Sequence, residues 1–335
     1  MIENSPKFIF ALTNLGSERA LKLEVEALNL PWLASYQRRG FLTFKVAQVA
    51  GSSLQQLVGQ PLACAGRLCI SLGRANSREE ALVMIRADPA YVAGPVHFLK
   101  TINGWMEREA EVAQKAAVNS ECIGTIVQLG ANEFWAGLHW HGPFISPDPG
   151  GESILVMPTD SPSRAWLKLE EAVRFFDLSF CRNDVVVELG CAPGGVVLAL
   201  LRRGVSVIGV DPAAMAEVIG EFTVLERPST SQGRPWFYHC RKPAALVAKR
   251  DLGGDVTWFM SDMNQTPEVV LAECGRFCKM APSIRHVFIT LKLTDVTRIA
   301  EKAKWHDALA AMDFNSIRFQ QFSVHHKEFA LYATK

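Results

Sequence analysis

The segment with the clearest chemical signature is VVVELGCAPGG, residues 185–195. Its apolar run, typical of a buried parallel strand, ends at Gly190, and Gly194 and Gly195 open the helix expected next. Glycines at such a turn let a ligand approach the backbone closely. Asp211 ends the next apolar run, SVIGVD, where a carboxylate can accept hydrogen bonds from two ribose hydroxyls. The pattern predicts a nucleoside-containing ligand, with a tight turn that binds nothing as the alternative.

The composition of the loop bears on which cofactor it would bind. A nicotinamide dinucleotide site normally reads GxGxxG, with the pyrophosphate at the N-terminus of the helix. Here the loop reads GCAPGG, and Pro193 removes one of the N–H donors that a pyrophosphate would use. The loop therefore favours S-adenosylmethionine, which has a ribose and an adenine but no phosphate, over a dinucleotide.

Strands and helices alternate around this turn from residue 163 onward. Apolar runs predict strands at 184–190, 206–211, 256–262 and 286–293. Helices are expected at 163–176, 195–203, 213–219 and 267–279, with a final helix and hairpin within 298–334. This alternation predicts an α/β fold with a doubly wound parallel sheet.

The first part of the chain has a different organisation. Strands are expected at 7–12, 40–46, 67–72, 123–129 and 133–140, and helices at 17–28 and 77–85. No nucleotide-binding glycine pattern occurs there, so this part reads as a compact α+β accessory or recognition domain. Residues 142–163 are rich in proline and glycine, which favour turns and extended chain. We therefore expect two domains, 1–150 and 151–335.

Composition narrows the class of protein. The 335 residues are 49% hydrophobic and 21% charged, which excludes a disordered or fibrous chain. The net charge of +1 gives no bulk attraction for nucleic acid, although a local basic face would still bind phosphates.

The cysteines and the N-terminus indicate a compartment. None of the eight cysteines forms a CxxC pair, and no partner stands at metal-ligand spacing. We expect buried free thiols and no metal. The acidic start MIENSPKFIFAL does not fit a signal peptide, and no apolar run is long enough for a membrane span. These features predict a cytoplasmic protein without a membrane partner.

A family resemblance extends this interpretation. The segment SPSRAWLKLEEA (161–172), followed by LGCAPGG, resembles the FtsJ-like ribose 2′-O-methyltransferases. The resemblance implies a Rossmann-like domain that uses S-adenosylmethionine. It is greatest to members that methylate a cytidine ribose in large-subunit rRNA, in which a smaller ferredoxin-like and THUMP-like α+β domain precedes the catalytic one.

In that family a Lys-Asp-Lys-Glu tetrad surrounds the target hydroxyl. The matching residues are Lys168 in KLEE, Asp262 in FMSDM, Lys292 in TLKL and Glu328 in HHKEFALY. Two neighbouring lysines repel each other, which we expect to lower the pKa of at least one. The resemblance then implies Lys292 as general base, oriented by Asp262. It also implies that Lys168 stabilises the developing alkoxide, and that Glu328 fixes a lysine or the ribose.

The resemblance also assigns the residues that bind the donor. They are Ala165, Gly190, Ala192, Pro193, Gly194, Gly195, Asp211 and Asp262. The chain departs from the family pattern at three places: Ala165 replaces a serine, Glu188 replaces an aspartate, and residues 236–246 lack the acid expected near the adenine.

The partner implied by the resemblance is large-subunit rRNA, naked or in an early particle, bound by a monomer. Basic and aromatic side chains of the first domain would then contact phosphates and bases. The candidates are Arg38, Arg39, Arg67, Arg74, Arg78 and Lys100 for phosphates, and Trp105, Trp135 and Trp140 for stacking. Two other functions stay open: a non-catalytic RNA-binding assembly factor with a decayed donor site, and a methyltransferase or dehydrogenase acting on a small molecule.

Overall fold

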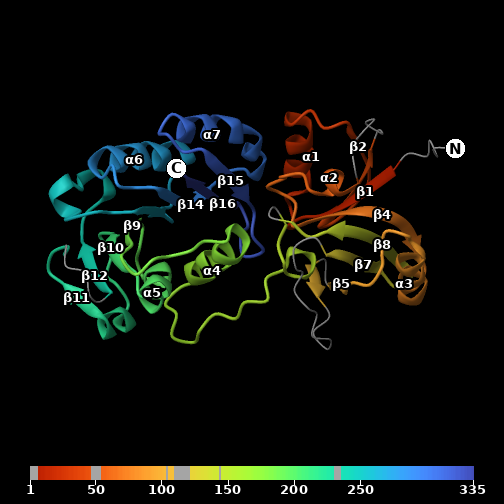
Figure 1. Ribbon diagram of the computed structural model, residues 1–335, viewed down its shortest axis with the longest axis horizontal. Coiled ribbons are helices and arrows are strands. Elements are labelled where there is room, and N and C mark those ends of the chain that lie inside the picture. The colour runs from red at the N-terminus through yellow and green to blue at the C-terminus, as the bar shows by residue number, and fades with distance from the viewer. Residues whose placement is uncertain (1–6, 47–53, 103–104, 109–120, 143–144, 230–234) are drawn as a thin grey trace. The chain divides into compact units, whose positions relative to one another are not determined.

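The computed structural model describes residues 7–46, 54–102, 105–108, 121–142, 145–229 and 235–335 (Figure 1). This part of the chain separates into two compact units. Unit 1 comprises the residues up to Ile154 together with the segment Gln320–His326. Unit 2 comprises Leu155–Phe319 and Lys327–Lys335. Each unit has its own sheet, and each is described by itself.

The sheet of unit 1 has the strand order β2–β3–β1–β4–β8–β7–β5–β6. Neighbouring strands pair antiparallel, except that β5 and β7 are parallel. The strands are β1 (Lys7–Leu12), β2 (Trp32–Arg38), β3 (Phe41–Val46), β4 (Arg67–Ala75), β5 (Val96–Ile102), β6 (Trp105–Arg108), β7 (Cys122–Gly130) and β8 (Glu133–Trp140). The helices are α1 (Glu18–Ala27), α2 (Leu54–Val58) and α3 (Arg78–Ala87), and a short 3-10 turn covers Pro149–Gly151.

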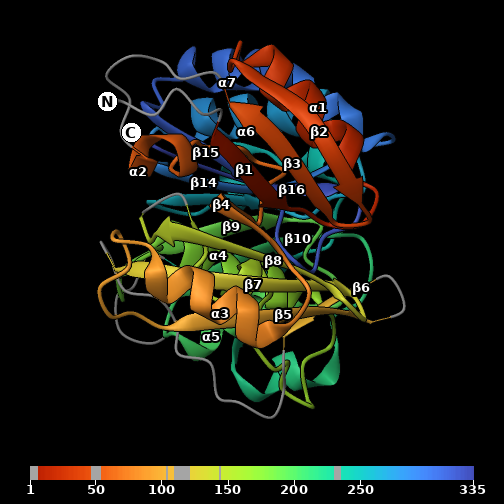
Figure 2. The same ribbon diagram turned by 90° about the vertical axis from the view of Figure 1, so that its right-hand side faces the viewer.

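Alternation along the strands of unit 1 produces two apolar faces. Helix α3 lies over one face (Figure 2) and packs Ala81 and Ile85 against Ile126 and other strand residues. Val127, the next residue along β7, belongs to a second cluster with Phe10 and Phe41. The start of α3 is fixed by Ser77, whose Oγ accepts a hydrogen bond from the Glu80 N–H at 3.1 Å. The Glu80 carboxylate in turn accepts a hydrogen bond from the Asn76 N–H at 2.8 Å, which also stabilises this helix start.

The sheet of unit 2 has the order β11–β12–β10–β9–β13–β14–β16–β15. The strands from β11 to β14 pair parallel, and β16 pairs antiparallel with β14. The strands are β9 (Val185–Leu189), β10 (Ser206–Val210), β11 (Thr223–Leu225), β12 (Trp236–Cys240), β13 (Trp258–Ser261), β14 (His286–Lys292), β15 (Ser316–Gln320) and β16 (Glu328–Thr334). The helices are α4 (Ala165–Phe176), α5 (Gly195–Arg202), α6 (Pro267–Met280) and α7 (Lys302–Ala310). The expected α/β doubly wound sheet is therefore confirmed for this unit.

The strand order of unit 2 explains where a ligand would bind. The chain proceeds from β9 to β10 and β12 on one side, and returns to β13 and β14 on the other. In open parallel sheets, ligands bind beyond the carboxyl ends of the strands where the order reverses in this way. The residues that follow β9, β10 and β13 are Gly190, Asp211 and Asp262, so the sequence motifs lie at this edge.

Some predicted elements are wrong or were missed. The helix expected at 213–219 is absent, and an irregular stretch leads instead into a 3-10 turn at Glu217–Glu221. Strands β2, β5, β6, β11 and β12 and helix α2 were not predicted, because these elements are short and their residues show no clear alternation or helical period. These strands form because their segments make hydrogen bonds with neighbouring strands, and a local sequence pattern does not indicate such pairing.

The cysteines of the structure are all free thiols. Cys64, Cys69, Cys191, Cys240 and Cys274 are buried as expected, whereas Cys181 is exposed. Among the described residues no group of three His, Cys, Asp or Glu side chains is placed to hold a metal ion. None of the described helices is long and apolar enough to cross a membrane.

Candidate active site

The turn after β9 has room only for glycine at three positions. Gly190 has a φ of 76°, and a Cβ there would lie 3.0 Å from the Met263 backbone. Gly194, with a φ of 116°, is the N-cap of α5. A Cβ at Gly195 would lie 2.3 Å from Ser163 Oγ and 2.9 Å from the Trp166 backbone nitrogen. The turn therefore packs tightly against the beginning of α4, as close helix packing at such a loop requires.

The Asp211 carboxylate is held beside this turn by backbone donors. Its Oδ2 accepts a hydrogen bond from the Ala192 N–H at 3.2 Å, and its Oδ1 accepts one from the Ala213 N–H at 2.8 Å. The Pro193 carbonyl accepts from the Ala216 N–H at 3.0 Å. A half-buried carboxylate in this position keeps free lone pairs for two ribose hydroxyls.

Four strand and helix ends bring the predicted tetrad together in unit 2. Lys168 lies in the first turn of α4, Asp262 directly follows β13, and Lys292 ends β14. Because β16 runs antiparallel to β14, its first residue, Glu328, pairs directly with Lys292 at the same edge of the sheet. The Asp262 N–H donates to the Leu189 carbonyl at 3.0 Å, which ties Asp262 to the end of β9.

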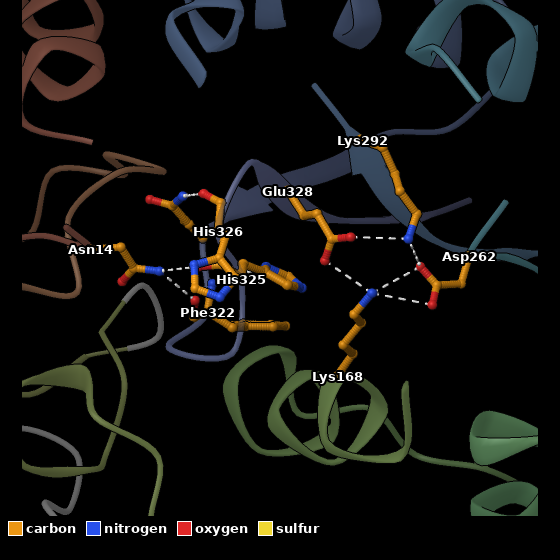
Figure 3. A network of polar contacts seen from close by, with 9 residues as sticks. Asn14, Lys168, Asp262, Lys292, Phe322, His325, His326 and Glu328 are labelled. Carbon is orange, nitrogen blue, oxygen red and sulfur yellow. Dashed lines mark hydrogen bonds and ion pairs between the residues drawn. The ribbon is translucent and has the colours of Figure 1, made fainter. Parts of the chain in front are cut away.

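The four side chains form a closed ring of alternating charge (Figure 3). Lys168 Nζ lies 3.1 Å from Asp262 Oδ1 and 2.9 Å from Glu328 Oε2. Lys292 Nζ lies 2.9 Å from Asp262 Oδ1 and 3.0 Å from Glu328 Oε1. The side chains are between 12% and 22% exposed, so the ring is largely shielded from water. Two ammonium groups and two carboxylates arranged in this way can hold a neutral polar group and exchange a proton with it.

Burial and ion pairing act in opposite directions on this ring. Burial by itself would raise the pKa of Glu328, but the Lys168 charge, helped by Lys292, outweighs it and lowers the pKa to about 2. For Lys292, burial opposes the charged form, yet Asp262 and Glu328 together raise its pKa above the ordinary value. The expected lowering of the pKa by lysine–lysine repulsion is therefore wrong for Lys292, because the two carboxylates within 3.0 Å of its Nζ favour the charged form.

Glu188, whose role the sequence left open, lies beneath the turn. It is 2% exposed, and its Oε2 has no hydrogen-bond partner within the described part of the chain. Burial raises the pKa of Glu188 well above its ordinary value, and the charges of Asp262 and Asp211 raise it further. Three carboxyl groups thus lie within electrostatic range of one another at the carboxyl ends of β9, β10 and β13, which is an environment suited to a cationic ligand.

Two of the expected contacts with the methyl donor, at Ala165 and near the adenine, differ from the family pattern. Ala165 begins α4 and offers only its backbone, as its side chain predicts. The region after β12 contains an acid that the sequence analysis did not consider, Asp251. Its Oδ1 accepts from Lys242 at 2.8 Å and its Oδ2 from the Ala248 N–H at 2.9 Å. Asp251 therefore stabilises its own loop. Residues 236–246 contain no carboxylate that could contact the adenine of the donor.

The proposed RNA contacts of unit 1 are corrected at one position. Arg67 is 1% exposed, and it donates to the Ser146 and Asp148 carbonyls, so it holds the chain of unit 1 together and cannot contact a phosphate. The other side chains vary in exposure: Arg38, Arg39, Arg74 and Lys100 are exposed, Arg78, Trp135 and Trp140 are half-buried, and the Trp105 side chain lies outside the described residues.

Residues 162–291 match the family model described as FtsJ-like methyltransferase. This match confirms the resemblance seen in the sequence and, with it, S-adenosylmethionine as the methyl donor of the matched family. The matched segment contains Lys168, Asp211 and Asp262, and it ends one residue before Lys292.

Curated relatives that share one name match parts of the chain. A protein named Ribosomal RNA large subunit methyltransferase M from Tolumonas auensis is 40% identical over 82 residues, covering 23% of this chain and 22% of the relative. One of the same name from Haemophilus influenzae is 29% identical over 175 residues, covering 50% of this chain and 44% of the relative. The matches thus span less than half of each relative.

Solved structures resemble the chain only distantly. The magnesium protoporphyrin IX methyltransferase of Synechocystis with bound S-adenosylmethionine is 16% identical, covering 51% of this chain and 79% of that protein. The TM-score between the two structures is 0.35.

Proposed function

We propose that the protein transfers a methyl group from S-adenosylmethionine to a ribose 2′-hydroxyl in large-subunit rRNA. The family resemblance indicates that this ribose belongs to a cytidine. The observation that carries the proposal is the closed ring of Lys168, Asp262, Lys292 and Glu328 beside a glycine turn, at the edge of the sheet where ligands bind. The matched family and the name shared by the curated relatives supply the reaction class and the RNA.

The residues at the turn fit a cationic nucleoside donor. Gly190, Gly194 and Gly195 allow the backbone to approach it, and Asp211 would hold its ribose. The unpaired Oε2 of Glu188 would face the positively charged part of the donor, with Asp262 nearby. When bound, the donor supplies an electrophilic methyl group. Pro193 has no N–H to donate to a pyrophosphate at the middle of the loop, which favours this donor over a dinucleotide.

The ring is suited to a hydroxyl that must lose its proton. The acceptor hydroxyl would enter among the two ammonium and two carboxylate groups, where Lys168 stabilises the developing alkoxide. Lys292, in its neutral form, would take the hydroxyl proton on Nζ as the ribose oxygen bonds to the methyl carbon and the carbon–sulfur bond breaks. Asp262 contacts both ammonium groups and fixes the lysines relative to the sheet.

The state of Lys292 sets the condition for this step. In the free protein its pKa is raised, so Lys292 is an ammonium at neutral pH and must lose a proton before it can act as a base. The arrangement therefore implies a reaction that becomes faster as the pH rises.

We propose that unit 1 recognises the RNA and corresponds to the THUMP-like domain of 1–150 expected from the sequence. We also propose that the protein is a cytoplasmic monomer. Exposed Arg38, Arg39 and Arg74 would contact phosphates, and half-buried Trp135 would contact a base. The conservative test is replacement of Arg74 by glutamine, which keeps the strand but removes the charge.

The experiment that tests the function uses methyl-labelled donor with total RNA and with ribosomal particles from a strain that lacks this protein. The proposal expects label in large-subunit rRNA that survives alkaline hydrolysis as a methylated dinucleotide. Label in free nucleosides or another small molecule would favour the small-molecule enzyme. Binding to RNA without donor binding would favour the assembly factor.

A further inference from the structure

The segment Gln320–His326, here called the strap, belongs to one unit by packing and to the other by chain connection. It packs as part of unit 1, whereas the residues before it, up to Phe319, and after it, from Lys327, belong to unit 2. Glu328, the carboxylate that contacts both site lysines, is the second residue after the strap.

Asn14 makes the central contact with the strap. Its side-chain amide nitrogen Nδ2 donates to the carbonyls of Phe322 and His325, both at 2.8 Å (Figure 3). An amide NH₂ group has two hydrogens, so this geometry uses both of them on one turn of the chain. Asn14 lies in the loop between β1 and α1, and its side chain is half-buried.

Other hydrogen bonds of unit 1 hold the first half of the strap. The Gln321 N–H donates to the Ala63 carbonyl at 2.7 Å, and Gln320 Nε2 donates to the Ala65 carbonyl at 3.1 Å. The Ser153 N–H donates to Ser323 Oγ at 3.2 Å. The strap is therefore fixed at several points along its length.

The strap is also rigid within itself. The His325 N–H donates to the Phe322 carbonyl at 3.0 Å, and the Phe322 N–H donates to His325 Nδ1 at 3.2 Å. Gln321 Nε2 donates to the His326 carbonyl at 2.8 Å. Gln321, Phe322 and His325 are at most 5% exposed. Its burial and these internal hydrogen bonds hold the turn in one conformation.

Only Lys327 separates the strap from Glu328, and it is itself held. The Leu293 N–H donates to the Lys327 carbonyl at 2.8 Å, next to the pairing of Lys292 with Glu328. The Glu328 oxygens lie 2.9 Å from Lys168 Nζ and 3.0 Å from Lys292 Nζ. Hydrogen bonds weaken steeply when stretched, so a shift of about 1 Å at the end of the strap would weaken both contacts.

We infer that Asn14 is a positioning residue: by fixing the strap, which ends two residues before Glu328, it sets the place of Glu328 between the two site lysines. The catalytic part of this inference rests on the proposed function, whereas the positioning part does not. A carboxylate displaced from this ring would no longer fix the lysines in line, and misplacement of about 1 Å can lower a rate by about 100-fold.

The test compares the full-length wild type with Asn14→Ala, with the conservative Asn14→Gln and with Asn132→Ala. Asn132 is an exposed amide of unit 1 in the turn between β7 and β8, so the last variant is a matched control. Hydrogen–deuterium exchange of the peptide that contains Lys327–Ala330 reports on Glu328 without requiring activity. Methyl transfer, followed with saturating RNA, separates kcat from the KM of the donor.

Positioning predicts that Asn14→Ala speeds exchange in Lys327–Ala330 and lowers kcat about tenfold or more, while the donor KM is unchanged. Asn14→Gln should recover part of both effects, and Asn132→Ala should match the wild type. Faster exchange in the strap alone, with Lys327–Ala330 and kcat unchanged, would overturn the inference. If the wild type methylates no acceptor, the proposed function fails, but the exchange result still decides whether Asn14 positions Glu328.

A second variant covers the case in which Asn14→Ala does not fold. Ser323→Ala removes the acceptor of the Ser153 N–H and leaves the Asn14 contacts in place. It should produce the same pattern at smaller amplitude, and an unchanged exchange rate at Lys327–Ala330 in a folded Ser323→Ala protein would count against the inference.

Discussion

Lys292 and Glu328 are direct partners in the antiparallel pairing of β14 with β16, and their side chains meet with Nζ 3.0 Å from Oε1. This single register position explains how two residues far apart in the sequence enter one site. A one-residue slip of β16 would turn Glu328 to the opposite face of the sheet. The ring with Lys168 and Asp262 therefore depends on the fold of the last strand as much as on the glycine turn.

The contribution of Glu328 to the free energy of unfolding should decrease at acidic pH. Its pKa of about 2 is below the ordinary 4.5, so the contribution is complete above about pH 4.5 and is lost as the pH falls through about 2. The shift corresponds to about 3 kcal/mol at most. Urea unfolding at several pH values should show a smaller loss of stability on acidification for Glu328→Gln than for the wild type. The exposed Glu226→Gln is the control, and equal acid sensitivity of all three proteins would contradict the ion-pair geometry.

Glu188 should have the opposite effect. Its raised pKa means that its contribution to stability is complete below its unfolded pKa, near 4.5, and is lost as the pH rises through the folded value. Glu188→Gln, which mimics the neutral acid, should therefore gain stability relative to the wild type at pH 8 and not at pH 4. A gain of about 1 kcal/mol is expected. Thermal unfolding measures it, with the exposed Glu217→Gln as a control that should show no such trend.

A pair of glycine substitutions tests the donor turn. In Gly195→Ala the new Cβ would meet Ser163 Oγ and the Trp166 backbone, whereas at Gly220 it would meet no atom within 4 Å. Gly195→Ala should lose donor binding and destabilise the protein by about 1–3 kcal/mol, as overpacked sites do. Gly220→Ala should bind donor like the wild type. Calorimetric titration with S-adenosylmethionine measures both, and normal affinity of a folded Gly195→Ala protein would place the donor elsewhere.

The pH dependence of catalysis should follow Lys292. Because its pKa in the free protein is raised above the ordinary 10.5, kcat/KM should rise about tenfold per pH unit between about pH 6.5 and 9 without a plateau. The profile is measured with the RNA that accepts methyl groups. A plateau beginning below about pH 8 would show that the base is another group, or that substrate binding changes the ring before the proton is removed.

The local parts of this architecture could be predicted from sequence, and the parts made by distant contacts could not. The turn from Gly190 to Gly195 and the helix after it follow from glycine positions and apolar runs, which are local signals. The raised pKa of Lys292 depends on Asp262 and Glu328, which only the sheet brings together. Arg67 was predicted to contact a phosphate because charged residues are usually exposed. It is buried instead, and its guanidinium donates hydrogen bonds to the backbone carbonyls of Ser146 and Asp148. The strap could not be predicted, since no sequence pattern indicates that Gln320–His326 packs with Asn14.

The central claim is that Lys292 removes the proton of the acceptor hydroxyl, and the most direct measurement is single-turnover methyl transfer by Lys292→Ala and Lys292→Arg. Both enzymes would be saturated with labelled S-adenosylmethionine, and donor affinity would be measured separately. We expect a loss of about 100-fold to 10,000-fold in both variants, with donor affinity retained. Arginine keeps the positive charge but cannot act as a base near neutral pH. A Lys292→Arg enzyme that transfers methyl groups at nearly the wild-type rate would contradict the account, because charge alone would then suffice.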